Sequence, residues 1–286
     1  MQRSAVLLLL LLVIGVGAYK LWPRHAGQPQ AQQGVAVNFD TRALTGDEQA
    51  AFLPLVCGGA GAGAGGYAHG CQSLPGYPSQ DYGGAGTGLG ITFTSVIYGH
   101  LTGADADEAY VSYRGSFEPH ASNFGGGILF HRQGNGWTLS RWYPGGAMEH
   151  CLSLNPQGRA RFLCLSGFTG QGETDTTLFL VSVPSGGQLN LSPVLKASDL
   201  RETMDPNANC GQRKSADQAV LLGIDSLARG GSFATAQVDY VPAAMADAAC
   251  KAKNFASASV QKASLALSWD GSSVGVSPDL HFAAAE

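Results

Sequence analysis

The stretch ITFTSVIY at residues 91–98 is the first in the chain with the character of a long β-strand. Isoleucine, threonine, valine and aromatic residues favour extended backbone because their branched or bulky side chains pack well on a pleated surface. Similar runs follow it, each bounded by glycine, proline, asparagine or aspartate, and each is expected to form a strand. These runs span residues 109–113, 128–131, 137–142, 161–165, 178–183, 218–224 and 235–241.

Short turn sequences between the runs predict that neighbouring strands are antiparallel. Residues 133–136 read QGNG and residues 155–158 read NPQG, and both are typical of tight turns between paired strands. A last hairpin is expected over Asp270-Gly271, between residues 265–269 and 273–276. The chain therefore predicts a series of hairpins rather than the helix crossovers of a parallel sheet.

Helices are expected to be few and short. Thr45 and Glu48 have the spacing of a capping box, so a helix should begin there and end near Pro54. Two further short helices are expected over residues 197–203 and 242–253.

Glycine is unusually frequent, at 40 of 286 residues, which is about twice its ordinary share. Frequent glycine indicates many tight corners, as all-β folds require. We therefore expect a mainly β fold, an antiparallel sandwich-like or propeller-like domain with a few short helices, stapled by disulfides. This single extracytoplasmic domain is expected to span residues 37–286, with a glycine-rich loop over residues 57–90.

The N-terminus is expected to direct the chain out of the cytoplasm. Residues 5–18 hold no charge and are dominated by leucine, a length that suits a cleaved signal peptide. Tyr19 and Trp22 could instead sit at a membrane interface and extend the apolar segment into a retained anchor. Residues 1–25 are thus expected to be a signal peptide or a membrane anchor, followed by a polar linker over residues 26–36, and the protein is either secreted or membrane-anchored.

All six cysteines follow the apolar segment, as expected of a domain that folds in an oxidising compartment such as a periplasm. An even number predicts three disulfides, although six cysteines allow 15 pairings. Pairing between neighbours is our prediction, and the second pair would staple the hairpin at residues 155–158. The predicted pairs are Cys57–Cys71, Cys151–Cys164 and Cys210–Cys250. The CxxC spacing of zinc sites does not occur.

The charge pattern bears on partners. The net charge is −4, charged residues make up 13%, and lysine and arginine form no cluster. Nucleic-acid binding is therefore not expected, because it needs basic side chains to neutralise phosphates. Partners remain open apart from a membrane, which the N-terminal segment would contact if it is retained.

Residues 98–111, YGHLTGADADEAYV, resemble the FG-GAP/VCBS repeats of integrin-like β-propellers. The resemblance covers this stretch only and implies a propeller-like fold with a calcium-binding acidic loop, whose ligands would be Asp105, Asp107 and Glu108. The glycine that closes that loop in the family is alanine here, so a solvated acidic turn is the competing interpretation. A weaker similarity to this stretch occurs 127 residues later and suggests an internal repeat. Five residues align with identical ones there: Ile97, Gly103, Ala109, Val111 and Tyr113 with Ile224, Gly230, Ala236, Val238 and Tyr240.

Two sets of polar residues are candidates for catalysis. Glu118 and His120 lie close together ahead of a glycine run, and Asn123 could line a pocket beside them. Glu173 follows in a second acidic loop with Asp175, and paired carboxylates are the usual catalysts of glycoside hydrolysis. Glu118, His120 and Glu173 are therefore the catalytic candidates for a hydrolase acting on carbohydrate or envelope material, and long polar loops are the alternative.

Aromatic residues cluster near one predicted hairpin. Trp137 and Trp142 are five residues apart, so strict alternation would place them on opposite faces of a strand. Trp142 and Tyr143, together with Asn123, are the candidate binding residues, whereas core packing is the competing role. No motif identifies an activity, and we expect a non-enzymatic binding or structural module, with a hydrolase and a calcium-stabilised domain as alternatives. No cofactor is implied beyond calcium.

Overall fold

The described part of the chain belongs to one structural unit, Val37–Glu286. The computed structural model describes residues 40–58, 67–71, 73–78, 89–115, 117, 125–154, 160–212, 214, 217–277 and 282–283. The predicted signal or anchor segment, the linker and most of the glycine-rich loop lie outside these residues. Among the described residues, no helix has the length and apolar character needed to cross a membrane.

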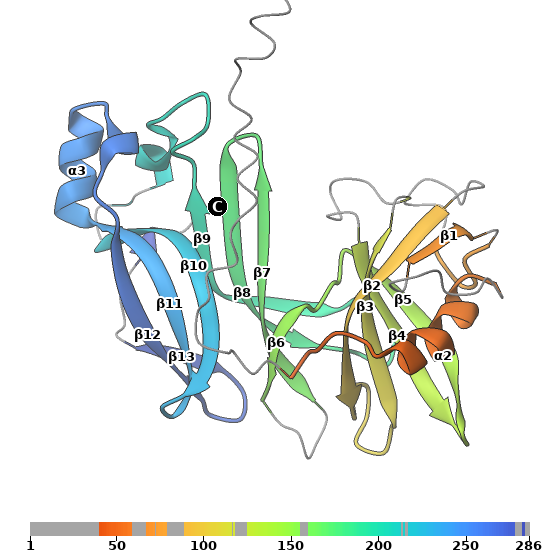
Figure 1. The fold of residues 1–286 in the computed structure, drawn as a ribbon. Helices are drawn as coiled ribbons and strands as arrows, with labels where there is room; N and C mark the ends of the chain where they lie inside the picture. Colours follow the sequence, from red (N-terminus) through yellow and green to blue (C-terminus); the bar gives the residue numbers. More distant parts are fainter. Residues whose placement is uncertain are drawn as a thin grey trace, which may run out of the picture. The chain divides into compact units, whose positions relative to one another are not determined.

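The fold is mainly β, as predicted, and its strands form three sheets (Figure 1). The first sheet has the order β1 (Tyr67–Cys71), β2 (Leu89–Gly99), β3 (Glu108–Gly115), β4 (Gly125–Gln133) and β5 (Gly136–Pro144). The second has the order β6 (His150–Ser153), β7 (Arg161–Gly170), β8 (Glu173–Ser182) and β9 (Asn190–Asp199). The third has the order β13 (Val274–Ser277), β12 (Gln261–Trp269), β11 (Phe233–Pro242), β10 (Ala219–Gly230) and β14 (Phe282–Ala283).

Among the described strands, consecutive ones pair antiparallel within each sheet, and only the short β14 pairs parallel, with β10. The predicted strands are confirmed, and the QGNG turn joins β4 to β5 with Gln133 opposite Gly136. The segments that align at a shift of 127 residues lie on β2–β3 and β10–β11, adjacent strand pairs of the first and third sheets. Within the described residues the sheets stack as layers and do not close into a ring.

The predicted helix over residues 197–203 is wrong. Ala197 and Ser198 continue β9 and pair with Thr176 and Asp175 of β8, and turns follow from Arg201. Pairing with a neighbouring strand outweighs the weak local preference of this short segment for helix, because a helix of one or two turns gains little without packing.

Helix α2 (Gly46–Val56) begins as predicted, with both hydrogen bonds of the capping box at Thr45 and Glu48. It runs two residues beyond Pro54, where the sequence predicted its end. A proline in this last turn removes one backbone hydrogen bond, and Cys57 N still donates to Leu53 O at 2.9 Å. Helix α3 (Ala243–Lys251) confirms the helix expected over residues 242–253, and the 3₁₀ turns η3 (Ala208–Gln212) and η4 (Phe255–Ser257) lie near it in the fold.

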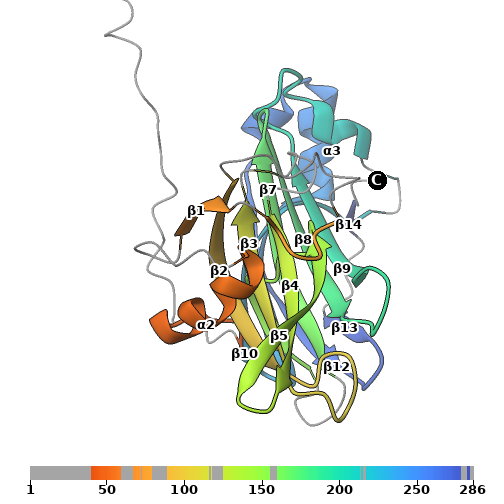
Figure 2. The same cartoon turned by 90° about the vertical axis from the view of Figure 1, so that its right-hand side faces the viewer.

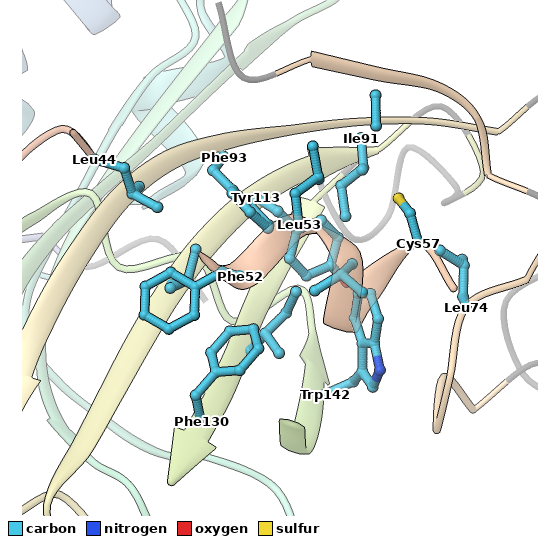
Figure 3. Close-up of a cluster of buried hydrophobic side chains, with 14 of the residues drawn as sticks. Leu44, Phe52, Leu53, Cys57, Leu74, Ile91, Phe93, Tyr113, Phe130 and Trp142 are labelled. Atoms are coloured by element: carbon cyan, nitrogen blue, oxygen red, sulfur yellow. The ribbon is translucent and has the colours of Figure 1, made fainter. Parts of the chain in front are cut away.

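The first sheet is buried on both faces, which explains why its strands are so apolar. Helix α2 covers one face, where Phe52 and Leu53 pack on Phe130 and Trp142 (Figures 2 and 3). The other face packs on the second sheet through Tyr110 and Tyr143 on one side and Phe162 on the other. The opposite face of the second sheet packs on the third sheet, in a core that includes Leu163, Leu178, Leu221, Ala236 and Leu265. Helix α3 and η4 cover a further cluster on the third sheet.

All three predicted disulfides are present and no described cysteine is free. Cys57, just beyond α2, joins Cys71 at the end of β1. Cys151 and Cys164 are directly opposite each other on β6 and β7, so this bond does staple a hairpin, although its turn lies outside the described residues. Cys210 in η3 joins Cys250 in α3 and ties these two elements together over 40 residues of sequence.

Candidate functional site

Three of the pockets on the described surface bear on function. The first, of about 380 Å³, is polar and contains Arg114, Glu149 and Asp225, from elements of all three sheets and their connections. A second, of about 370 Å³, includes the ion pair between Asp40 and Arg229. The third, of about 290 Å³, lies between the end of β5 and the start of β9. We call the third the β5 groove; it is lined by Pro78, Trp142, Tyr143, Pro144, Gly145, Gly146, Gly187, Gln188, Leu189 and Leu191.

The β5 groove brings together two of the three residues that the sequence proposed for binding. Trp142 and Tyr143 are consecutive in β5, so their side chains leave opposite faces of the strand, and both reach the groove because it lies beside the strand. Both rings are largely buried, at 5% and 4% exposure. Their polar atoms are already used, since Trp142 Nε1 donates to Pro75 O at 2.7 Å and Tyr143 OH donates to Pro184 O at 3.3 Å. The rings therefore form walls whose N–H and O–H donors are already bonded within the protein.

The opposite wall is apolar and exposed. Leu191 is 46% exposed, and Leu189 lies beside it in the lining of the groove. The bond from Arg141 Nη1 to Gly187 O, at 3.1 Å, ties this wall to β5. A Cβ on Gly146 would lie 2.6 Å from a methyl carbon of Leu189 and 3.0 Å from Tyr143 O, so a side chain there would displace Leu189 at the base of the groove. The sequence did not indicate this wall, because it lies more than forty residues beyond Trp142.

The prediction that Trp137 and Trp142 lie on opposite faces is wrong. Leu129 pairs with Arg141 and Phe130 with Leu139, which leaves Ser140 as an extra residue in β5. This β-bulge shifts the alternation by one residue. Both tryptophans consequently pack against the same core, beneath α2. A bulge of this kind has no reliable signature in the sequence.

The catalytic candidates are only partly described. Glu118 and His120 lie outside the described residues, as does the third binding candidate, Asn123. Glu173 begins β8, and it lines none of the three pockets named above. Burial, followed by the neighbouring Asp175 carboxylate, raises the pKa of Glu173. The structure thus places the two carboxylates of this acidic loop on the same face of β8, outside the three pockets named above.

The calcium candidates have separate surroundings. Glu108 is fully buried, and its carboxylate accepts hydrogen bonds from Leu101 N at 2.9 Å and from Thr102 N at 2.7 Å. It also accepts from Thr102 Oγ1 at 2.6 Å and lies 2.9 Å from His131 Nδ1. Asp107 lies 3.7 Å from Arg132 Nε and Asp105 is exposed. In the part of the chain that the structure describes, no three histidine, cysteine or acidic side chains form a group suited to a metal ion.

Arg42, Glu48 and Tyr98 form a polar cluster that joins α2 to the first sheet. The sequence predicted only the role of Glu48 in the capping box. Glu48 closes the capping box, and its carboxylate also binds the Arg42 guanidinium through two bonds of 2.7 and 2.6 Å and accepts from Tyr98 OH. The Arg42 hydrogen bonds lower the pKa of Glu48 to about 2, with help from Tyr98 and the backbone of Thr45. Burial and then the bond to Glu48 raise the pKa of Tyr98.

Because of this cluster, we expect the packing of α2 on the first sheet to weaken at acidic pH. Because the folded-state pKa of Glu48 lies below its ordinary value of 4.5, the stabilisation is present above pH 4.5 and is lost as the pH falls towards 2. As the pH is lowered from 4.5 towards 2, the urea midpoint of unfolding, measured by circular dichroism, should decrease more for the wild type than for Glu48→Gln. Equal pH dependence of the two proteins would contradict this contribution.

Comparison with protein-family models, with curated proteins and with solved structures finds no match for this chain.

Proposed function

We propose that this chain is a non-enzymatic binding module that holds an extended peptide in the β5 groove. The three disulfides indicate an oxidising, extracytoplasmic environment for the domain. The observation that carries the proposal is the position of the groove between two sheet edges: β5 ends the order of the first sheet and β9 ends that of the second.

Edge strands favour a peptide ligand. The outer edge of a terminal strand carries backbone N–H and C=O groups that a second extended chain can pair with. Recognition by strand addition combines these backbone bonds with pockets for alternate side chains. Here Leu189 and Leu191 offer an apolar wall for one set of these side chains, and Gly145 and Gly146 line the groove without side chains of their own.

The geometry supports a sugar less well. A sugar ring stacks on an exposed aromatic face, but Trp142 and Tyr143 are almost entirely buried. Their indole N–H and phenol O–H are bonded to Pro75 and Pro184, so neither is available to a hydroxyl-rich ligand. An apolar side chain within an extended peptide suits this lining better.

The proposal is tested by titrating the ¹⁵N-labelled full chain with short capped peptides of alternating valine and threonine, and separately with a panel of monosaccharides and disaccharides. We expect the peptides to shift the amide signals of Gly145, Gly146 and residues 187–191. Leu191→Asp should weaken peptide binding by about tenfold or more, because it places a charge in the apolar wall.

The matched control is Val260→Asp, which alters an exposed apolar residue outside the groove. It should bind the peptides as the wild type does. Equal loss of binding in both variants, or shifts in the groove caused by sugars and not by peptides, would refute the peptide proposal. Turnover of the sugars would favour a hydrolase instead.

A further inference from the structure

We propose that the pocket of about 380 Å³ binds a free basic α-amino acid, lysine or arginine, independently of the β5 groove. In this arrangement Arg114 and Glu149 hold the α-carboxylate and the α-ammonium group, and Asp225 holds the cationic end of the side chain. The pocket lies at the edge of β7, where this strand continues beyond the end of its neighbour β6 (Figure 1).

The pairing of β6 with β7 determines which way the backbone groups of β7 point. Cys151 and Cys164 have Cα atoms 4.1 Å apart, which is the spacing of a non-hydrogen-bonded pair. The N–H and C=O groups of Cys164 therefore point away from β6, and those of the residues at odd positions point towards it. Arg161 O confirms this alternation, because it accepts a hydrogen bond from Leu154 N at 2.9 Å.

Gly167 is at one of these odd positions, but β6 has no residue opposite it. The pairing ends with His150 opposite Leu165, because the preceding chain turns to the first sheet, where Met148 N donates to Ser112 Oγ at 2.8 Å. Gly167 lines the pocket and has no side chain to cover its backbone. Its N–H and C=O groups therefore face the pocket and can bond to a ligand.

Arg114 and Glu149 offer both charges that an α-amino acid headgroup requires. Arg114 Nη2 lies 3.4 Å from Glu149 Oε2, farther than the roughly 2.7–2.9 Å of a strong charge-assisted bond. The Arg114 side chain is 67% exposed, and Glu149 takes only one of its several N–H donors. A ligand carboxylate can bind the other donors, while the neighbouring ammonium group bonds to Glu149. Gly167 adds a donor and an acceptor to the same headgroup.

Asp225 lies on the side of the pocket formed by the third sheet and favours a cation there. Lys262 bridges Asp225 and Asp239, at 2.6 and 2.8 Å. Two carboxylates and one ammonium group leave this set with a net charge of −1, whereas the ion pair at the other end is neutral. With His150 counted as neutral, a ligand of net charge +1 balances the pocket. Lysine and arginine have this charge, because they carry a side-chain cation in addition to the two charges of the headgroup.

The lining between the two ends suits an unbranched side chain. Leu165 and Thr176 contribute methyl groups from β7 and β8, against which the methylene groups of lysine or arginine can pack. The volume lies within the range of about 300–1,000 Å³ that is usual for small-molecule sites. An acidic amino acid would instead bring a further negative charge towards Asp225, and a neutral one would leave the pocket with its excess negative charge.

The test is a titration of the ¹⁵N-labelled full, disulfide-bonded chain with L-lysine and L-arginine, followed by NMR. We expect saturable shifts in the amide signals of Ala147, Glu149, Ser166 and Gly167. L-Norleucine lacks the side-chain ammonium group and L-lysine amide lacks the carboxylate. Each should bind about tenfold more weakly or worse, because each loses a hydrogen bond between charged groups.

Two variants assign the two ends of the ligand. Arg114→Gln should weaken the binding of lysine and of norleucine alike, by about tenfold or more. Asp225→Asn should reduce lysine binding to the level of norleucine and leave norleucine binding unchanged. Arg132→Gln is the matched control, because it alters an arginine whose ion pair with Asp107 lies outside the pocket, and it should bind lysine as the wild type does.

The proposal is overturned if neither lysine nor arginine gives saturable shifts at these residues, or if norleucine binds as tightly as lysine. Equal binding of Nα-acetyl-lysine and lysine would also overturn it, because the pocket would then recognise the C-terminal residue of a peptide. Leu191→Asp should leave lysine binding unchanged, so that failure of the β5 groove proposal and failure of this one are distinguishable.

Discussion

Replacing Glu108 by alanine is expected to lower the free energy of unfolding by about 2–5 kcal/mol, because each buried donor left without its acceptor costs about 1–3 kcal/mol. The Glu108 side chain is fully buried, and its two oxygens take bonds from the backbone N–H groups of Leu101 and Thr102. Alanine would leave both donors, and the Thr102 hydroxyl, without their acceptor. It would also remove the oxygen that lies 2.9 Å from His131 Nδ1.

Urea denaturation followed by far-ultraviolet circular dichroism measures this loss. Asp105→Ala is the matched control, since Asp105 is an exposed acid three residues away, and it should change the free energy of unfolding by less than about 0.5 kcal/mol. Glu108→Gln should fall between the two, because its amide oxygen can accept from the loop while its amide nitrogen cannot. A cost below about 1 kcal/mol for Glu108→Ala would show that the network contributes little.

Glu108 also shows what the sequence could predict and what it could not. Three acidic residues between two strands are typical of an exposed turn or an ion-binding loop, and both interpretations placed Glu108 in solvent or on a metal. In the structure Glu108 is the first residue of β3 and pairs with Gly99 and His131 of its neighbours. That position directs its carboxylate back into the loop at Leu101 and Thr102. Only the pairing register of three strands determines this direction, and the register is not local.

The strands themselves were predictable because their signals are local. Alternating or continuous apolar runs, bounded by turn residues, specify β2 to β5, and the cysteine order with a hairpin turn was enough to pair Cys151 with Cys164. The failures have one cause. The predicted helix at residues 197–203 and the predicted alternation of Trp137 and Trp142 were overruled by cross-strand pairing, in the second case through the bulge at Ser140.

The candidate sites likewise contain some residues that local sequence indicated and others that only the fold brings together. Trp142 and Tyr143 were found from composition, because adjacent aromatic residues at the end of a strand stand out. Their partners Leu189 and Leu191 precede or begin a strand that the sequence did not reveal. Ser198 was assigned to a helix, so its position beside Asp175 could not be foreseen. Residues that meet across sheets or strands carry no shared local pattern.

The second large effect is expected at the disulfide with the longest loop. Replacing both Cys210 and Cys250 by alanine should lower the free energy of unfolding by about 4 kcal/mol, because the bond closes a loop of 40 residues. The Cys151–Cys164 disulfide closes a loop of only 13 residues, so replacing both of its cysteines by alanine should lower the free energy of unfolding by about 3 kcal/mol. The contacts of α3 add to the first figure, since Cys210 and Cys250 pack against a cluster that includes Phe255 and Val220.

Denaturation without reductant measures both variants, and thiol titration of the unfolded protein should find no free thiol in the wild type and six after reduction. The comparison separates two origins of stability. If chain entropy dominates, the Cys210–Cys250 variant loses more than the Cys151–Cys164 variant, although the latter joins two fully paired strands. The reverse order would show that the cross-strand bond stabilises by fixing native packing, so that its buried position between the first and second sheets outweighs the length of the loop it closes.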